Sequence, residues 1–392
     1  MIVLNKKIFG VLFFSIFTAV MGVGIVVPLL PVYAHDLGAS GLYIGLIFGS
    51  FSLSRTLFLP YFGRLSDRKG RKPFIACGLF AYSLVSIAFI LSNDVATLIV
   101  IRFFQGIASA MIMPVAQAYV GDITSEGDEG FSMGLFNMSI FLSLSIGPLL
   151  GGIISDRFSL KAAFFCMGIL AFIGFLLSYF FLPQTREERS KSFGKKPISW
   201  VALIRDRELA GLFVFRLSYT ACIGVIWAFL PVFASVNFAL SPSLIGILVM
   251  LGVLISGLIQ TPAGYIADRV NRKIMILAGG GIACASLVFF QNSSGFWNLF
   301  YASVLFGIGG GISMPPLMAL AVTKGNQAEA MGSVMAILTM AHSIGMMTGS
   351  IVAGLTMDLF QLRYAFMGGA VIMLLGLAAF MMTWISLKKR EA

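Results

Sequence analysis

The chain has 392 residues, of which 58% are hydrophobic and only 11% are charged, and its mean hydropathy is +0.96. A soluble globular domain carries about 25% charged residues, so this composition excludes an ordinary water-soluble protein. A net charge of +11 would suggest nucleic acid as the partner of a soluble chain, but here we interpret it as membrane topology and expect no nucleic-acid partner.

Apolar runs of about 20 residues predict twelve transmembrane helices and an all-α integral membrane protein, because helices pair every backbone polar group in lipid. The short alternating segments of a membrane β-barrel are absent from the sequence. The first run is too long for a signal peptide and lacks a small-residue cleavage site, so we expect it to be retained. The predicted spans are 8–34, 41–63, 74–93, 95–120, 131–155, 161–182, 209–233, 243–266, 274–291, 296–322, 330–355 and 363–387.

The distribution of Lys and Arg predicts the orientation of these spans. Of the 27 basic residues, 21 fall in segments on one side of the membrane and three on the other, and three lie inside spans. Basic residues accumulate on the cytoplasmic side, so both termini and the long linker are expected in the cytoplasm, as in a multi-pass protein of the inner membrane. The four cysteines fall within apolar spans and no pair has metal-ligand spacing, so we expect no metal site.

A charged motif between the second and third spans is repeated. The segment GRLSDRKGRK (63–72) recurs 201 residues later as GYIADRVNRK (264–273). The repeat continues along the chain, with matches at Gly45 and Gly246, Gly106 and Gly307, Pro114 and Pro315, Gly134 and Gly332, Gly147 and Gly345, and Asp156 and Asp358. Six spans on either side of a polar linker predict two parallel repeats: a bundle over 1–182, a cytoplasmic linker over 183–208 and a second bundle over 209–392.

Over essentially its whole length the chain resembles the major facilitator superfamily, and within it the twelve-span drug–proton antiporters of multidrug efflux. The charged motif at 63–72 resembles that family's signature between helices 2 and 3. The resemblance implies twelve helices in two pseudo-symmetric six-helix bundles and transport by alternating access, with a substrate site between the halves.

The resemblance implies a conformational latch at the signature motif. Its aspartate and arginines help to hold the two halves of family members in the outward-facing state. In this chain the resemblance assigns the latch to Gly63, Asp67, Arg68, Gly70 and Arg71, with Asp122 as a partner. In the second copy it assigns the latch to Asp268 and Arg269. The alternative is that the basic residues only set topology, although topology does not require an aspartate in both copies.

The fourth span carries Arg102, Gln105 and Gly106, which resemble the family's RxxQG motif. An arginine two turns inside a span is costly in lipid, so we expect it to face the protein interior or a wet cavity. In proton-coupled family members this arginine is associated with proton transfer. The alternative is that Arg102 extends toward the headgroups at the near side of the membrane.

The fifth span resembles the family's antiporter motif, which favours exporters that exchange substrate for a cation. Small residues at this spacing let helix backbones approach closely, and proline bends the helix; close packing alone is the alternative. The motif residues are Gly134, Ser143 (in place of a glycine), Gly147, Pro148, Gly151 and Gly152.

Three ionisable residues lie well inside spans, namely Arg55, Arg216 and His342, whereas no Asp or Glu lies in the central part of any span. Two hypotheses follow. In the first, transport is coupled to protons through Asp36 or His342, with Arg102 as a further candidate. In the second, Arg55 binds an anionic or zwitterionic substrate. A structural role for Arg55 or His342 is the alternative to both. The expected cavity residues are Arg55, Gln105, Gln117, Asn137, Arg216 and Gln260.

These observations predict a secondary active transporter rather than an enzyme. We find no P-loop and no nucleophile constellation in the sequence, and expect no cofactor. A channel or a receptor does not explain two homologous halves. The preferred function is proton-coupled efflux of small amphipathic organic molecules by a chain that works as a monomer. The alternative is a carrier of organic anions by uniport or exchange, and lipid flipping comes third.

Overall fold

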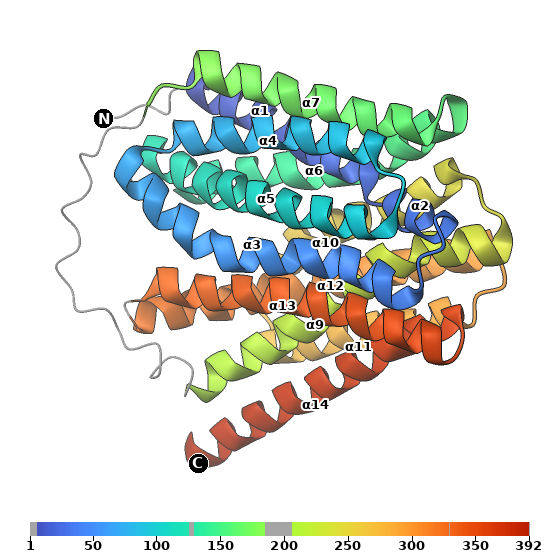
Figure 1. The fold of residues 1–392 in the computed structure, drawn as a ribbon. Helices are drawn as coiled ribbons and strands as arrows, with labels where there is room; N and C mark the ends of the chain where they lie inside the picture. Colours follow the sequence, from blue (N-terminus) through green and yellow to red (C-terminus); the bar gives the residue numbers. More distant parts are fainter. Residues whose placement is uncertain (1–5, 125–128, 185–205, 329, 392) are drawn as a thin grey trace. The chain divides into compact units, whose positions relative to one another are not determined.

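A computed structural model describes residues 6–124, 129–184, 206–328 and 330–391 (Figure 1). These residues form α-helices and one short 3₁₀ helix, η2, and no strand occurs among them. The helices are α1 (Lys6–Val26), α2 (Leu30–Asp36), α3 (Gly41–Lys69), α4 (Lys72–Leu91), α5 (Val95–Ile123), α6 (Glu129–Arg157), α7 (Leu160–Phe181), α9 (Arg207–Phe238), α10 (Pro242–Ala267), α11 (Arg272–Gln291), α12 (Phe296–Gln327), α13 (Met331–Leu359), η2 (Leu362–Tyr364) and α14 (Ala365–Glu391).

Twelve helical segments of the described chain are long and apolar enough to cross a membrane. This confirms the predicted all-α fold with twelve spans. The predicted span over 8–34 is confirmed as the segment Lys7–Asp36, but this segment is not one continuous helix, because α1 ends at Val26 and α2 begins at Leu30. Pro28 and Pro31 explain the break, since a proline has no N–H to donate and its ring clashes with the preceding helical turn.

The signature segment is mostly helical rather than a loop. Helix α3 continues to Lys69, six residues beyond the predicted end of the second span at Gly63. Within the extra turns Ser66 Oγ donates to the Gly63 carbonyl, and Asp67 pairs with Arg71, which lies just beyond the end of the helix. The helix stops at Gly70, whose φ of +86° lies in the left-handed region that glycine adopts without strain.

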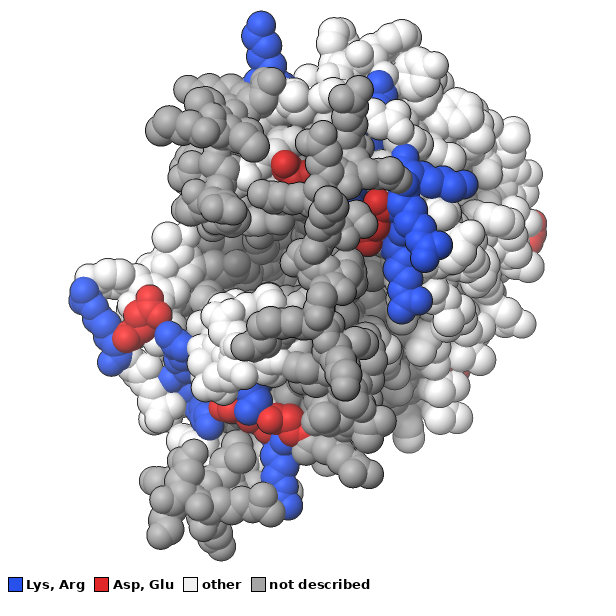
Figure 2. Space-filling view, turned by 90° about the vertical axis from the view of Figure 1, so that its left-hand side faces the viewer, with Lys and Arg blue, Asp and Glu red and all other residues white. Residues whose placement is uncertain are grey.

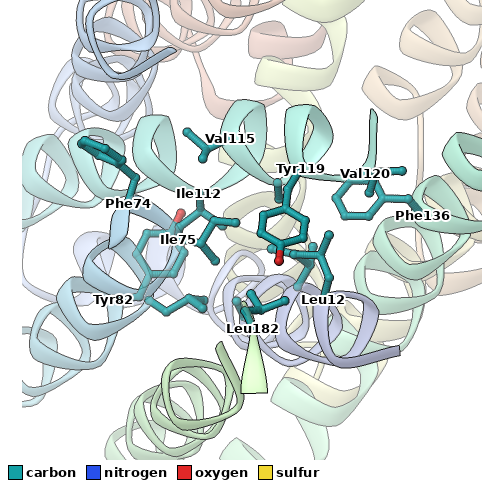
Figure 3. Packing of buried hydrophobic residues seen from close by; sticks show 14 of the residues in the cluster. Leu12, Phe74, Ile75, Tyr82, Ile112, Val115, Tyr119, Val120, Phe136 and Leu182 are labelled. Carbon is teal, nitrogen blue, oxygen red and sulfur yellow. The ribbon is translucent and has the colours of Figure 1, made fainter. Parts of the chain in front are cut away.

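The helices group into two compact units. The first comprises Met1–Gly38, Ser50–Phe193 and Ser241–Met250. In it, α1 packs on α6 and α7, while α4 packs on α5 and α7. Buried side chains from α1, α4 and α5 fill its centre, where Leu12, Ile75 and Tyr119 meet (Figure 3). The Tyr119 hydroxyl donates to the Pro183 carbonyl at 2.8 Å, which satisfies the one polar atom of this side chain.

The second unit comprises Ala39–Gly49, Gly194–Leu240 and Leu251–Ala392. In it, α9 packs on α13 and α14, and α11 packs on α12 and α14. Helices α3 and α10 therefore each contribute their first turns to one unit and their remainder to the other. The domain boundaries expected at 182 and 209 stay a prediction, and most of the predicted linker, residues 185–205, lies outside the described residues.

Candidate functional site

The first copy of the signature motif places one arginine among three acceptors. Arg71 forms ion pairs with Asp67 on α3 and with Asp122 near the end of α5, the latter through Nε at 3.1 Å, and its Nη1 also donates to Ser66 Oγ at 2.8 Å. The Arg71 side chain is only 14% exposed. The arginine thus joins the end of α3 to the end of α5, and Gly70 makes the turn that brings it there.

The second copy keeps the ion pair but not the other partners. Arg272 Nη2 lies 3.1 Å from Asp268 Oδ1, and Arg272 Nε donates to the Ala267 carbonyl at 3.3 Å. Asn271 stands where the first copy has Gly70, and its side chain accepts the Lys273 N–H at 3.0 Å to cap α11. Arg269 stacks on the exposed Tyr265 ring, 3.9 Å from the ring centroid.

A further network of charges lies at the start of α9. Lys324 Nζ is 2.8 Å from Asp206 Oδ2 and 3.6 Å from Glu208 Oε2, and Lys273 Nζ is 3.3 Å from Glu208 Oε1. Burial raises the pKa of Asp206, but hydrogen bonds from Lys324 and from the Leu209 N–H outweigh it and hold the pKa below its usual value. Figure 2 shows basic and acidic side chains lying beside one another at several points of one face. This network was not predicted from the sequence, although Asp206 and Glu208 stand just before the predicted start of a span and beside basic residues.

The RxxQG residues form a buried pair in the first unit. Arg102 is 5% exposed, its Nη1 donates to Gln105 Oε1 at 2.7 Å, and its guanidinium lies 4.5 Å from the centroid of the Phe51 ring on α3. The next residue, Gly106, lets α5 approach α3 this closely, because a Cβ there would overlap Ser54 Oγ and the Phe51 carbonyl. Arg102 therefore lies in the protein interior, as the cost of burying it in lipid predicts.

Arg55 lies near this pair. Tyr82, which hydrogen-bonds with Ser109, interacts electrostatically with both Arg55 and Arg102. Two donors in the group are buried without a hydrogen-bond partner among the described residues, Arg55 Nε and Gln105 Nε2. A buried donor without an acceptor costs about 1–3 kcal/mol, so this group is suited to receiving an acceptor.

In the second unit, Arg216 lies beside His342. Arg216 Nη2 is 3.5 Å from His342 Nδ1, and Nη1 contacts Met314 Sδ at 2.6 Å. An arginine can donate to Nδ1 only when that nitrogen carries a lone pair, so the arrangement fits a neutral imidazole with its proton on Nε2. The structure thus brings together two residues that the sequence separates by 126 positions.

Three of the antiporter-motif residues of α6 lie against the backbone of α1, whereas a Cβ on Gly134 would meet no atom within 4 Å and one on Gly152 would overlap the Pro242 carbonyl of α10. Ser143 Oγ donates to the Phe17 carbonyl at 2.9 Å. A Cβ on Gly147 would lie 2.8 Å from the Gly24 Cα, and one on Gly151 would overlap the Ile25 carbonyl. The matching residues of α13 pack in the same way on α9, where Gly345 meets Leu217 and Gly349 meets Ala221. Small residues are therefore required at these positions for two pairs of helices.

A family profile described as Major Facilitator Superfamily matches residues 12–236 and 209–392, which together cover nearly the whole chain. The chain belongs to the Major Facilitator Superfamily. This makes it a multi-pass membrane transporter of a small molecule and not an enzyme. The family was therefore correctly predicted from the repeated signature motif, and the twelve spans were correctly predicted from the apolar runs.

Several relatives cover almost all of this transporter. An uncharacterized MFS-type transporter of Methanocaldococcus jannaschii is 32% identical over 360 residues, 91% of this chain and 92% of the relative. Multidrug resistance protein 2 of Bacillus subtilis is 28% identical over 400 residues, 99% of this chain and 97% of the relative. The crystal structure of the nucleoside transporter NupG has the same fold, with a TM-score of 0.81 at 14% identity over 96% of this chain and 99% of NupG.

The remaining predicted site residues of this superfamily member are more exposed. Asp36 is 69% exposed and has His35 Nδ1 at 4.0 Å as its neighbour. Gln117, Asn137, Gly134 and Arg68 are also exposed, and Gln260 is half-buried. A Cβ on Gly63 or Gly134 would meet no atom within 4 Å. Their functional roles stay predictions.

Proposed function

We propose that this transporter is a proton-coupled exporter of small amphipathic organic molecules in the cytoplasmic membrane, working as a monomer with both termini in the cytoplasm. The observation that carries the proposal is the packing of the antiporter motif. Ser143, Gly147 and Gly151 all lie on the side of α6 that meets α1, so these three residues of the motif serve one helix contact. In the family that this motif resembles, it favours exchange of substrate for a cation.

A full-length relative supports the same substrate class. The Bacillus subtilis protein is named a multidrug resistance protein and aligns with 99% of this chain. Its name is carried over here as part of the proposal. Export by exchange also suits a chain whose sequence has no nucleotide-binding loop.

For coupling, we assign the proton to His342. Its Nδ1 faces Arg216, and a protonated imidazole cannot accept from a guanidinium. Uptake of a proton would therefore separate these two side chains, which links protonation to a movement of α13 against α9. Asp36 is the next candidate because it is an exposed carboxylate, and Arg102 would act by orienting Gln105.

For switching, we assign the latch to Asp67, Arg71 and Asp122, with Arg68 as an exposed neighbour and the second copy, Asp268 and Arg269, in a lesser role. The shared, largely buried Arg71 supports this assignment. An ion-pair cluster of this size biases a two-state equilibrium by about 1–3 kcal/mol, which is the range that switching requires.

The test uses purified protein in liposomes with ethidium, a lipophilic cation, as the probe. An imposed proton gradient should drive ethidium transport, collapse of the gradient with an ionophore should stop it, and His342→Asn should uncouple it. Ethidium transport that is unchanged after the gradient has been collapsed contradicts proton coupling. Absence of any ethidium transport by folded protein contradicts the proposed substrate class.

A second candidate, transport of organic anions, is favoured by the group around Arg55. The described Asp residues of the first unit, at positions 36, 67, 94, 122 and 156, stand at helix ends, whereas Arg55 and Arg102 lie well inside α3 and α5. Two buried guanidinium groups and the unpaired donors of Arg55 and Gln105 would suit a carboxylate or phosphate.

Arg55→Ala separates the two candidates. If the substrate is anionic, benzoate or an organic phosphate should be transported by the unmodified protein and not by the variant, and Arg55→Lys should restore part of the rate. Arg64→Ala is the matched control, since Arg64 is an exposed arginine on the same helix. An Arg55→Ala variant that keeps every anion flux shows that Arg55 has a structural role.

A further inference from the structure

A short segment that follows α7 contacts the signature motif of the first unit. Gln184 Nε2 donates to the Lys69 carbonyl at 3.3 Å, and Lys69 is the last residue of α3. The last four carbonyls of a helix have no partner within the helix, so Gln184 provides a donor for one of them just before the turn at Gly70. We call residues 182–184 the strap.

The strap is also held from the interior of the unit. The Tyr119 hydroxyl of α5 donates to the Pro183 carbonyl at 2.8 Å. Leu182 is 1% exposed and lies in the same hydrophobic cluster as Tyr119 (Figure 3). Leu65 of the signature motif packs against this cluster as well. A buried leucine on the strap and a buried tyrosine on α5 therefore fix its position against the unit.

The tyrosine that holds the strap also lies near an acceptor of the signature arginine. Tyr119 and Asp122 are three positions apart on α5, so they lie on the same face of the helix, and the two side chains interact electrostatically. On the other side of Gly70, Lys72 Nζ lies 5.9 Å from the centroid of the Tyr179 ring, which stands in the last turn of α7. The end of α7 and the strap therefore contact the turn on both sides of its glycine.

We propose that Tyr119 and Gln184 are positioning residues of the signature turn: through the strap they hold residues 69–72 where Arg71 meets its two aspartates. Arg71 follows Gly70, and glycine adopts many backbone conformations, so the ion pairs alone do not fix the path of the turn. The strap adds a hydrogen bond on the main chain, which does not depend on the Arg71 rotamer. The proposal rests on the latch assigned above to Arg71, but every contact that it uses lies within the first unit.

The second repeat has changed the residue that would hold a strap. Leu320 stands 201 positions after Tyr119, at the matching place in the repeat, and a leucine has no hydroxyl to donate. Asn271 replaces Gly70 and caps α11 with its own side chain. The strap therefore accompanies the copy whose arginine connects two helices, which supports a role in placing that arginine.

The test follows the mobility of the turn and needs no substrate. A nitroxide label is attached to Lys69→Cys in a chain whose four cysteines are replaced by alanine, and its electron paramagnetic resonance spectrum is recorded in purified protein. The Lys69 side chain is exposed and its carbonyl makes the contact, so the label leaves the strap in place. The measured quantity is the ratio of mobile to immobile label.

Two variants of nearly unchanged size each remove one donor. Tyr119→Phe keeps the ring in the cluster and removes the hydrogen bond to Pro183, and an ionised Gln184→Glu side chain cannot donate to the Lys69 carbonyl. We expect each variant to raise the mobile-to-immobile ratio about fivefold, the factor that one typical hydrogen bond contributes to such an equilibrium. Gln184→Lys restores a donor at the end of α3 and should reverse part of this increase.

Matched controls distinguish positioning from general loosening. The Tyr33 hydroxyl also donates to a backbone carbonyl of this unit, that of Ser92 at 2.6 Å, but at the opposite end of α4 from the turn. Tyr33→Phe should therefore leave the label at position 69 unchanged. A second reporter, Val270→Cys, occupies the place of Lys69 in the other copy and is likewise exposed, and its spectrum should not change in either strap variant.

Transport by the same variants tests whether the strap acts through the latch. Gln184→Glu should lower ethidium efflux about twofold by itself and should add little to the loss caused by Asp67→Asn, because both changes act on Arg71. Full additivity of the two losses would mean that the strap acts elsewhere and would overturn the positioning role. If Asp67→Asn leaves transport unchanged, the proposed latch fails, and the label at position 69 still decides whether the strap holds the turn.

The proposal is overturned if the label at position 69 keeps the parent spectrum in folded Tyr119→Phe and Gln184→Glu protein, or if Tyr33→Phe changes the spectrum as much as they do. An equal response of the Val270→Cys reporter overturns it as well. If Tyr119→Phe does not fold, Gln184→Glu decides alone, since Gln184 is exposed and its replacement leaves the core intact.

Discussion

The two copies of the signature motif share a sequence pattern and an ion pair but differ in what surrounds that pair. Arg71 reaches Asp67, Asp122 and the Ser66 hydroxyl, so it connects two helices. Arg272 reaches the Asp268 side chain four residues earlier on the chain and the Ala267 carbonyl, so these contacts stay local.

Single substitutions explain the difference. Thr323 stands where the first repeat has Asp122, and its hydroxyl donates to the Ala319 carbonyl of its own helix. The adjacent Lys324 forms ion pairs with Asp206 and Glu208. After duplication, one copy has kept an inter-helix connection through its arginine, while the other half uses a lysine to hold the start of α9. A repeated motif therefore does not imply a repeated mechanical role.

The largest effect is expected from Asp67→Asn compared with Asp268→Asn. Loss of the Asp67 charge removes one carboxylate partner of the largely buried Arg71, so transport should fall about tenfold, while expression and membrane insertion stay normal. Asp268 is 71% exposed and its pair is local, so Asp268→Asn should change transport less than about twofold. Initial rates of ethidium efflux from vesicles with matched protein content provide the measurement, and equal losses in the two variants contradict the comparison.

A smaller effect is expected from Asp122→Thr, which gives the first repeat the residue found in the second. Arg71 keeps Asp67 and Ser66, so the loss should be about threefold and should not add fully to that of Asp67→Asn. The double variant in the same efflux assay checks this. Full additivity would mean that the two carboxylates do not act through one arginine.

The smallest effect is expected from Asp206→Asn, which tests the second half. Asparagine caps a helix as well as aspartate does, so the variant removes mainly the ion pair with Lys324. We expect this loss to lower the free energy of unfolding by about 1 kcal/mol. The pKa of Asp206 is lowered in the folded protein, so its stabilisation is present above the unfolded value of about 3.9 and is lost as the pH falls through the folded value.

Thermal unfolding of purified Asp206→Asn in detergent checks this prediction. The difference in midpoint from the parent should be constant between about pH 5 and pH 7 and should shrink below about pH 4. Glu208→Gln is a matched control, since Lys324 keeps Asp206 at 2.8 Å in that variant. A difference that grows on acidification contradicts the assigned sign.

The sequence predicted the family, the span count and the charged motif because these depend on composition and local spacing. Asp122 could be named as a partner of the signature motif because it closely follows the fourth predicted span and the family resemblance implied a latch there. The break at Pro28 was missed because the surrounding residues remain apolar, so hydropathy does not change there.

Contacts between distant helices could not be predicted in the same way. Asp156 and Asp358 were recognised as a repeat-related pair at span ends, but the backbone N–H groups from which they accept hydrogen bonds depend on where α10 and α3 begin in space. The contact between Arg216 and His342 depends on the rotation of two helices about their axes, which spacing within either one does not determine.

Proton exchange is the property on which the proposed function most depends. Liposomes that contain the purified protein and a pH-sensitive dye, with equal pH on both sides, measure it directly when ethidium is added outside. An antiporter should move protons outward as ethidium enters, so the internal pH should rise, and it should not rise in protein-free liposomes or with His342→Asn. Ethidium entry through the protein at constant internal pH would contradict proton-coupled exchange.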